Sequence, residues 1–410
     1  MTSLLNTSLS ASPAKPLLPD VGVIGLVYHH WGSRWLTPHH VFARLGRYFH
    51  VVWVNPAHEW REIPEHIKAQ MTRPVEGHDS PGFQVYRPEW WLPKFFRPQW
   101  LADFTFDQRL RKARQALIKQ GCKKIVLYMW DFRYERALSS SLFDLSCYHI
   151  EDEYSFSTVE VPVDPSEARV ISMVDEVFII SPAMMEKKGK INLHTTLISH
   201  GVDYKAYATP APEPMDIASI PHPRIGYSGF LKKQLDWSLL LQLATMHPEW
   251  SFVFVGAQKH DEIGSLIGEL SRRPNVYFLG AKPVKELAYY PQHFDACIMP
   301  YQMDDYTKFI FPLKLYEYLA SGRPVVGSPI RSLLDYAHVV KLARTPEEWS
   351  EALTSSLAPR AGSDEQAKIR CAVAQENDWS AQIYRLAYIV SSRLGQTYKE
   401  RLKKIPMEEA

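Results

Sequence analysis

Short runs of hydrophobic residues recur along the chain, and longer segments of mixed polar and hydrophobic character separate them. In the first half they span Val21 to Val27, Val51 to Val54, Lys124 to Trp130, Cys147 to Ile150, Glu176 to Ile180 and Thr196 to Ser199. In the second half they span Arg224 to Gly229, Ser251 to Gly256, Asn275 to Gly280, Ala296 to Pro300, Pro324 to Gly327 and Val339 to Leu342. Continuous hydrophobic runs between helical segments are typical of parallel strands buried on both faces. The pattern predicts an α/β protein with two Rossmann-like parallel-sheet domains that face each other across a cleft.

The boundary between the halves is a Pro- and Ala-rich stretch, which is typical of an interdomain linker. A chain of 410 residues is long enough for two hydrophobic cores. We expect a flexible leader at residues 1–19, a first domain at 20–205, a linker at 206–223 and a second domain at 224–375. Residues 376–410 are expected to form a C-terminal helix that can pack back onto the first domain.

Composition restricts the class of protein. With 46% hydrophobic and 22% charged residues, the chain is typical of a folded globular protein. A formal net charge of +2 argues against a dedicated nucleic-acid binder. The cysteines are too scattered for a zinc site or a disulfide framework, and they favour a reducing cytoplasm; they are Cys122, Cys147, Cys297 and Cys371.

The segment 307–327 has the most specific pattern. Pro312 suits the first position of a helix and Gly322 the position just past its end. Lys314 and Glu317 then share one face of the opening turns, where the helix dipole and free N–H groups favour an anion. A lysine there can hold a diphosphate, and a carboxylate one turn later can accept hydrogen bonds from a ribose. An ordinary surface ion pair explains the same spacing equally well.

This segment resembles the nucleotide-binding signature of family-4-type GT-B glycosyltransferases. Glu317 matches the residue that contacts the ribose of the sugar nucleotide, although Phe309 stands where the family often has a second glutamate. Lys314 is similar to the diphosphate ligand of the bacterial teichuronic-acid and exopolysaccharide branch, which includes the xanthan glucuronosyltransferase. The resemblance implies a GT-B fold and a nucleotide diphosphate sugar as donor, and it adds Gly229, Tyr301 and Thr307 as nucleotide-sugar candidates. Lys232 is a further candidate that could substitute for the family's usual basic residues, although a solvated surface pair with Lys233 explains it equally well. Tyr301 can equally be a core residue that lines the cleft.

Three consecutive acidic residues, Glu151, Asp152 and Glu153, directly follow a predicted strand of the first half. Sugar transfer with inversion needs a carboxylate that takes the proton of the acceptor hydroxyl. Asp152 resembles the catalytic base of the xanthan enzyme, and we take Asp152 and Glu153 as the catalytic candidates. The alternatives are a solvated turn that caps the next helix, and a retaining enzyme that needs no such base.

The loop from His29 to His40 follows the first strand and leads into a helix with Thr37 as its expected cap and Pro38 at its first position. The histidines have no carboxylate or cysteine partner at metal-ligand spacing, so we expect no metal. We also expect no cofactor besides the donor substrate. Loop packing is the alternative to acceptor binding, for which the candidates are Arg34, His39, His40 and His200.

Aromatic and basic residues are interleaved between Arg87 and Lys124, a combination that suits a membrane headgroup interface. Aromatic core packing beside a solvated basic helix is the alternative. No hydrophobic run approaches the roughly 20 residues that span a bilayer, and residues 1–19 lack the pattern of a signal peptide. The sequence therefore predicts peripheral contact with anionic membrane on the cytoplasmic side.

Together these features predict a glycosyltransferase that uses a nucleotide diphosphate sugar and a saccharide or lipid-linked saccharide acceptor. The expected products are bacterial cell-surface polysaccharides, and no nucleic acid is expected as a partner. Two alternatives remain, namely a non-hydrolysing sugar-nucleotide epimerase and a catalytically silent subunit that binds the nucleotide sugar.

Overall fold

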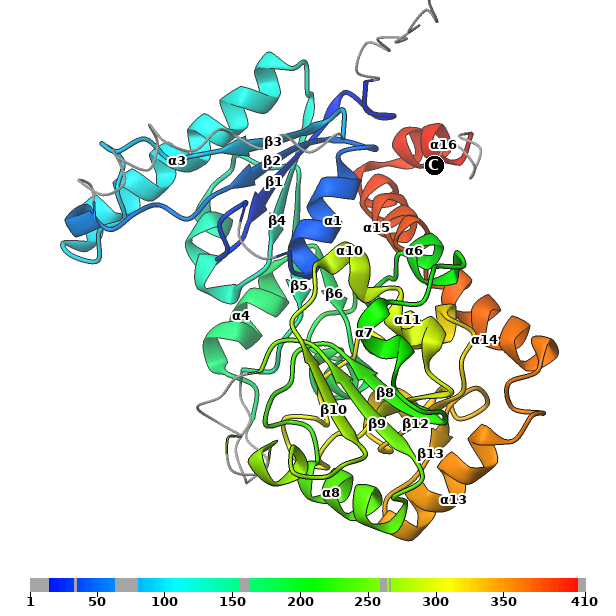
Figure 1. The fold of residues 1–410 in the computed structure, drawn as a ribbon. Coiled ribbons are helices and arrows are strands. Elements are labelled where there is room, and N and C mark those ends of the chain that lie inside the picture. Colours follow the sequence, from blue (N-terminus) through cyan, green and yellow to red (C-terminus); the bar gives the residue numbers. More distant parts are fainter. Residues whose placement is uncertain are drawn as a thin grey trace, which may run out of the picture.

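The computed structural model describes residues 15–32, 35–62, 80–154, 162–258, 264 and 267–404. These residues form two domains, each with a parallel sheet between layers of helices (Figure 1). All strand pairs within the two sheets are parallel, as expected for strands that read as continuous hydrophobic runs. The predicted α/β architecture with two parallel-sheet domains is confirmed.

The first sheet has seven strands in the described part of the chain, in the order β3-β2-β1-β4-β5-β6-β7. Their bounds are β1 (Val21–Leu26), β2 (His50–Val54), β3 (Phe83–Tyr86), β4 (Lys124–Met129), β5 (Leu145–Ile150), β6 (Glu176–Ile179) and β7 (Thr195–Leu197). The sequence pattern did not predict β3. Its four residues are all half-buried because it is an edge strand, so it lacks the hydrophobic run of its neighbours.

The second sheet has six strands in the described residues, in the order β10-β9-β8-β11-β12-β13. Their bounds are β8 (Arg224–Ser228), β9 (Ser251–Val255), β10 (Val276–Gly280), β11 (Ala296–Met299), β12 (Val325–Gly327) and β13 (Lys341–Leu342). The order reverses next to β8, between β8 and β11. In open α/β sheets, ligands bind beyond the carboxyl ends of the strands at such a point.

Helices cover both sheets. In the first domain they are α1 (Thr37–Leu45), η1 (Trp60–Glu62), α3 (Gln99–Lys119), η2 (Phe132–Ser139), α4 (Pro165–Met173) and α5 (Pro182–Lys188). In the second they are α8 (Trp237–Met246), α10 (Val284–Leu287), η3 (Tyr290–His293), α11 (Lys314–Ala320), α12 (Arg331–Leu334), α13 (Pro346–Leu357) and α14 (Asp364–Glu376).

The expected linker is an ordered segment. It contains most of α6 (Tyr204–Ala208) and all of α7 (Met215–Ala218), and Ile217 and Ile220 are buried in the core. The Arg224 guanidinium donates to the Ile220 carbonyl at 2.8 Å and to the Glu213 carboxylate at 2.5 Å. These contacts fasten the segment to the start of β8.

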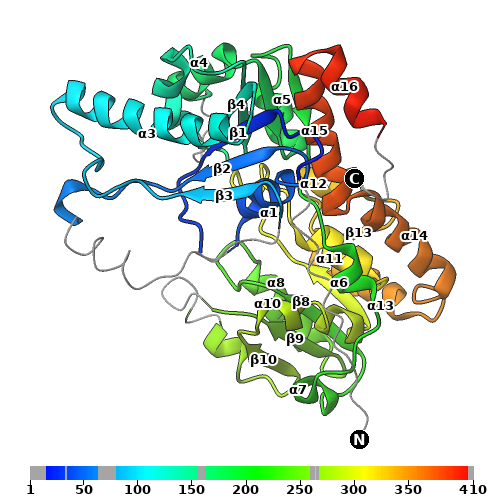
Figure 2. The same ribbon diagram turned by 90° about the horizontal axis from the view of Figure 1, so that it is seen from above.

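The C-terminal residues form two helices, α15 (Trp379–Leu394) and α16 (Gln396–Lys403), separated at Gly395 with φ +130°. Hydrophobic residues of α15 lie in one buried cluster with residues of α1 and β1, among them Trp379, Ile383 and Leu386. Figure 2 shows α15 and α16 beside the first domain, although α14 still lies against the second. The chain therefore crosses between the domains twice, once before β8 and once at α15.

Two helix starts differ from the predictions. Helix α11 begins at Lys314, so Pro312 precedes the helix by two residues, whereas Gly322 ends it with φ +73° as expected. Helix α1 includes Thr37, and Leu36 takes the capping position. The Thr37 hydroxyl instead lies 3.2 Å from His200 Nδ1, so it links α1 to the loop after β7.

Candidate functional site

The turn after β8 is shaped by two glycines and one lysine. Gly229 has φ +136°, and a Cβ atom built there would lie 2.2 Å from Lys314 Nζ. A Cβ atom on Gly256, which follows β9, would lie 1.9 Å from the Gly229 carbonyl oxygen. The Lys314 ammonium also lies 5.3 Å from the ring centroid of Tyr227. Because Gly229 and Gly256 have no side chains, the Lys314 ammonium at the start of α11 can pack directly onto the backbone of this turn.

Tyr318 of α11 fixes the same turn from the other side. Its hydroxyl accepts from the Ser228 amide at 2.9 Å and donates to the Ser228 carbonyl at 3.3 Å. Both the turn and Lys314 are thus held by α11. The predicted candidates Gly229 and Lys314 lie together at the carboxyl edge of the second sheet.

Glu317 lies one turn after Lys314 and is half-buried. Burial raises the pKa of its carboxyl group, while the charge of Lys314 and a hydrogen bond from the Tyr207 hydroxyl lower it. Tyr207 belongs to α6, and no motif in the sequence indicates its role. The carboxylate is therefore held by a neighbour while it faces a cavity.

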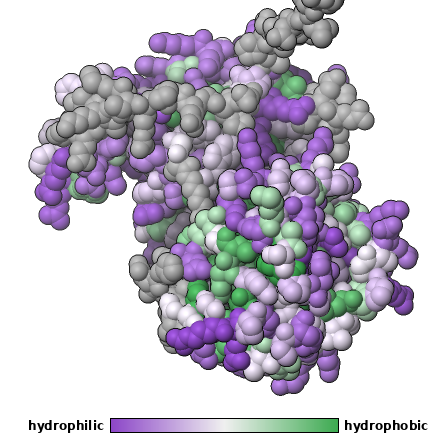
Figure 3. Space-filling view, in the orientation of Figure 1, coloured by the Kyte–Doolittle hydropathy of each residue, from purple (hydrophilic) through white to green (hydrophobic). Residues whose placement is uncertain are grey.

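That cavity has a volume of about 680 Å³ and lies between α6, α10, α11 and the start of α15. Its walls include Glu317 and Leu313 from α11 and its cap, Tyr289 beyond α10, and His40 with Trp379 from the first-domain side. Figure 3 shows that hydrophobic side chains gather on the second domain in this view, where α7 and α10 lie. The volume is within the range of cavities that enclose small organic ligands.

Two further nucleotide-site candidates are buried. Tyr301 is 5% exposed and lies beside Tyr227 and Lys314, and burial raises the pKa of its hydroxyl. Thr307 is fully buried, with its hydroxyl donating to the Gln302 carbonyl and accepting from the Asp304 amide at 3.1 Å. The geometry therefore places Tyr301 beneath the site and assigns Thr307 to the shape of its own loop instead of a ligand contact.

The acidic residues after β5 differ sharply in their surroundings. Glu153 is buried and pairs with Lys188 at 3.2 Å and with Lys187 at 3.4 Å. Lys188 in turn pairs with the buried Glu167 at 2.8 Å. These ion pairs hold Glu153 inside the first domain, which is a structural position and not the catalytic position that the sequence suggested.

Asp152 is exposed between the two domains. Desolvation by the surrounding protein raises the pKa of its carboxyl group, and the charges of Lys232, Lys188 and His29 lower it. Lys232 belongs to the loop after β8, so the charge of the second domain acts directly on this carboxylate. Burial raises the pKa of the Tyr306 hydroxyl in the second domain, and the charge of Asp152 raises it further. The structure thus brings the candidates Asp152 and Lys232, one from each domain, close enough for their charges to interact.

Glu151 is a residue that the sequence analysis did not select. Its carboxylate accepts from Trp130 Nε1 at 2.7 Å and from the Thr37 hydroxyl, and burial raises its pKa to about 7. Trp130 directly follows β4, the strand next to β5. The carboxyl ends of neighbouring parallel strands meet at one edge of a sheet. The positions of Trp130 and Glu151 in the sequence could therefore have indicated that the two side chains lie close together.

The histidine candidates have different environments. His39 is fully buried among Trp31, Trp35 and Trp53, and its Nδ1 accepts from the Leu36 amide at 3.2 Å. Burial lowers the pKa of its imidazole, so it is a neutral core residue. The predicted acceptor contact by His39 is therefore not supported by its position.

The other histidines lie nearer the cleft. His200 is 5% exposed, and burial lowers its pKa to about 4. Its ring lies 6.0 Å from that of Phe311 in the second domain. His40 stacks on Trp379 at 5.0 Å and lines the large cavity. Arg34 lies outside the described residues.

Among the residues that the structure describes, no group of three or more His, Cys, Asp or Glu side chains is arranged to hold a metal ion. Metal independence stays a prediction.

Comparison with known proteins finds a similarity that lies in the second domain. Residues 222–358 match the family described as "Glycosyl transferases group 1". The chain is also 29% identical over 230 residues to TuaH of Bacillus subtilis strain 168, a protein named for glycosyl transfer in teichuronic acid biosynthesis. That match covers 53% of this chain and 57% of TuaH, so the chain spans little more than half of this relative's length.

Solved structures match nearly the whole chain. HepE of Anabaena, solved with UDP and glucose, has a TM-score of 0.63 and 15% identity, and the match covers 90% of this chain and 99% of HepE. An Escherichia coli trehalose-6-phosphate protein with bound UDP-2-fluoro glucose also has a TM-score of 0.63, with 11% identity over 91% of this chain and 99% of that one. These likenesses establish the GT-B fold that the sequence resemblance implied.

Proposed function

We propose that this protein transfers a sugar from a nucleoside diphosphate sugar to a saccharide acceptor. The observation that carries the proposal is the pairing of Lys314 on the bare backbone of Gly229 with Glu317 at the wall of the 680 Å³ cavity. This geometry offers a cation for a diphosphate and a carboxylate for a ribose diol, three residues apart on one helix. HepE and the E. coli protein were solved with uridine nucleotides, and their likeness supports the same donor class.

The acceptor would enter from the first domain. Asp152 lies opposite Lys232, so a hydroxyl group between them could lose its proton to the carboxylate while the second domain holds the donor. TuaH is named for teichuronic acid biosynthesis, which supports a polysaccharide of the bacterial cell surface as the product.

A panel of UDP-, GDP- and TDP-sugars tests the activity. With a membrane extract as the acceptor source, we expect one donor to release its nucleoside diphosphate, and labelled sugar to enter the lipid or saccharide fraction. Binding of a donor without turnover would identify a silent binding subunit. Conversion of the free sugar nucleotide without release would identify an epimerase. Either result would overturn the proposal.

We further propose that the first domain docks on anionic membrane, where a lipid-linked acceptor would be presented. Six exposed aromatic residues form an aromatic tip, each 48 to 69% exposed: Trp60, Trp90, Trp91, Phe96, Trp100 and Phe104. They belong to η1, the segment before α3 and the first turns of α3, which project together from the first domain in Figure 2. Arg97 lies in the same segment and Arg111 lies on a later turn of α3, and both are exposed. Arg109 is not, because its guanidinium donates to the Leu92 and Pro93 carbonyls at 2.9 Å. Among the described residues no helix is both long and apolar enough to cross a bilayer.

Charge reversal at Arg97 and Arg111 is expected to release the protein from anionic vesicles at physiological salt. Each cation near such a surface adds about 1 kcal/mol, and salt screens it. Trp91→Ala with Trp100→Ala should weaken the binding that remains in high salt. Co-sedimentation measures both effects, with Lys190→Glu and Lys368→Glu as matched reversals of exposed lysines elsewhere. A wild-type protein that stays in the supernatant at low salt would contradict membrane docking.

A further inference from the structure

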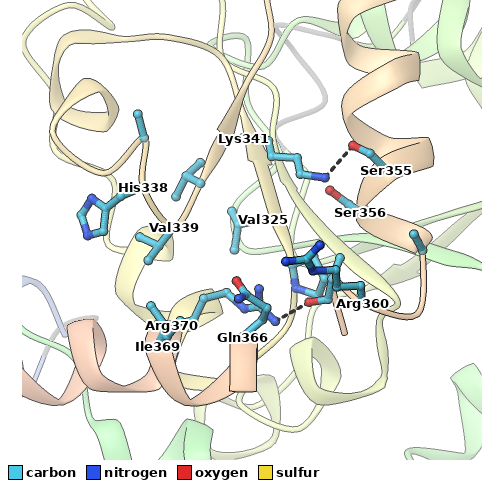
Figure 4. Close-up of a pocket in the computed structure, with 15 residues that line it drawn as sticks. Val325, His338, Val339, Lys341, Ser355, Ser356, Arg360, Gln366, Ile369 and Arg370 are labelled. Atoms are coloured by element: carbon cyan, nitrogen blue, oxygen red, sulfur yellow. Dashed lines mark hydrogen bonds between the residues drawn. The ribbon is translucent and has the colours of Figure 1, made fainter. Parts of the chain in front are cut away.

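A second cavity, of about 490 Å³, lies at the amino ends of strands of the second sheet, whereas the proposed donor site lies at the carboxyl ends. It is lined by the first residue of β12, the segment that leads into β13, the end of α13 and the middle of α14. Gly229 and Tyr301 follow the carboxyl ends of β8 and β11, whereas Val325 and Lys341 stand at the amino ends of their strands. Figure 4 shows the side chains that surround this space. A ligand in this cavity would not compete with one at Lys314 for space.

The charge of the lining is one-sided. Lys341, Arg360 and Arg370 all line the cavity, and none of its lining residues, all of which are described, is Asp or Glu. Burial and the charge of Arg370 lower the pKa of Lys341. Burial lowers the pKa of Arg370, and the charge of Arg323 lowers it further. The charges of Lys341 and Arg370 repel each other. An anion placed among the three lining cations would be stabilised by all of them.

Two of the three cations, Lys341 and Arg370, are also held in place. Lys341 Nζ donates to the Ser355 hydroxyl at 2.5 Å, the contact drawn as a dashed line in Figure 4. Arg370 donates from Nε to the Gly322 carbonyl at 2.9 Å and from its terminal NH₂ to the Ala361 carbonyl at 2.8 Å. Fixed donors of this kind lose less entropy when they bind an anion.

The remaining walls are hydrophobic. The lining includes Pro324, Val325, Val339 and Ile369, of which Val339 and Ile369 lie away from the Lys341 ammonium in Figure 4, and Gln366 adds one amide group. A free inorganic ion would leave these walls in contact with water. A molecule that carries both an anionic group and a small apolar or ring-shaped body fits the lining better.

We propose that this cavity binds a phosphate ester, with the phosphoryl group between Lys341, Arg360 and Arg370 and the organic part against Val339 and Ile369. Phosphate oxygens accept charge-assisted hydrogen bonds from both arginine and lysine. The site is independent of the donor site, because the two lie at opposite ends of the strands of one sheet.

A calorimetric titration with phenyl phosphate, carried out in saturating UDP, tests this proposal. We expect binding that persists with UDP present, that inorganic phosphate competes away weakly, and that phenol does not reproduce. Lys341→Gln combined with Arg360→Gln should weaken it about ten-fold or more. Lys368→Gln, an exposed lysine of α14 outside the cavity, should leave it unchanged.

Two results would overturn the proposal. The first is no phenyl phosphate binding to the wild-type protein in saturating UDP. The second is binding that the double variant leaves intact. A lower melting temperature beside that unchanged affinity would show that the cations only serve the carboxyl end of α13. If the double variant fails to fold, Lys341→Arg, which keeps the charge, should still bind and Lys341→Gln alone should bind more weakly.

Discussion

Asp152→Asn is expected to lower turnover about 100-fold or more and to leave nucleotide affinity unchanged. The substitution keeps the size of the side chain and removes its ability to take a proton, so a general base loses most of its contribution. Surrounding protein raises the pKa of Asp152 above 3.8. The wild-type rate should therefore fall as the pH drops through that raised pKa. Initial rates at several pH values, combined with calorimetric titration of the nucleoside diphosphate, measure both quantities.

Glu151→Gln is the matched variant for the neighbouring carboxylate. Burial raises the pKa of Glu151 from 4.5 to about 7, so the folded protein binds this proton more tightly than the unfolded chain. The wild-type free energy of unfolding should therefore decrease as pH rises between these two values. Glu151→Gln, which cannot ionise, should be more stable than the wild type at pH 8, by about 1 to 3 kcal/mol.

The two variants separate the two carboxylates. If Asp152 is the base, Glu151→Gln keeps most of its turnover and Asp152→Asn loses about 100-fold or more. The reverse pattern would make Glu151 the base and would contradict the assignment to Asp152. A near-normal rate in both folded variants would favour a retaining reaction that needs no such base, and the anomers of the product, measured by NMR, would decide this independently.

The sequence predicted the strands well because most of them are buried on both faces, which leaves a continuous hydrophobic run. The sequence did not predict β3, because its half-buried position at the edge of the sheet gives Phe83–Tyr86 a mixed pattern in place of a continuous hydrophobic run. Prolines and alanines indicate a linker between the domains, but they do not show that Ile217 and Ile220 of this segment pack in the core.

The site was predictable where one helix carries its residues. Lys314 and Glu317 are three residues apart on α11, so their common face follows from helix geometry. The roles of the three acidic residues after β5 were harder to predict, because the local sequence does not show that Glu153 pairs with Lys187 and Lys188. Contacts between distant segments, such as Thr37 with His200 or Tyr207 with Glu317, depend on how the domains meet. Local pattern carries no record of such pairs.

Lys314→Ala is expected to weaken binding of a nucleoside diphosphate by about 1.5 to 3 kcal/mol, or roughly 10- to 150-fold. The ammonium lies against Gly229 at the carboxyl edge of the second sheet, where an incoming diphosphate would meet it. Because the effect depends on phosphate charge, it should be much smaller for the free nucleoside. Lys308→Ala, an exposed lysine six residues earlier in the chain, is the matched control and should bind normally.

Glu317→Ala should weaken binding through the ribose instead. The loss is expected with the ordinary nucleoside diphosphate and should vanish with its 2′,3′-dideoxy analogue, which has no hydroxyl groups for the carboxylate to accept from. Calorimetric titration of the two variants with the three ligands therefore assigns each side chain to its part of the nucleotide. Unchanged affinity in both Lys314→Ala and Glu317→Ala would place the donor elsewhere in the cleft, and the 680 Å³ cavity would then need another ligand.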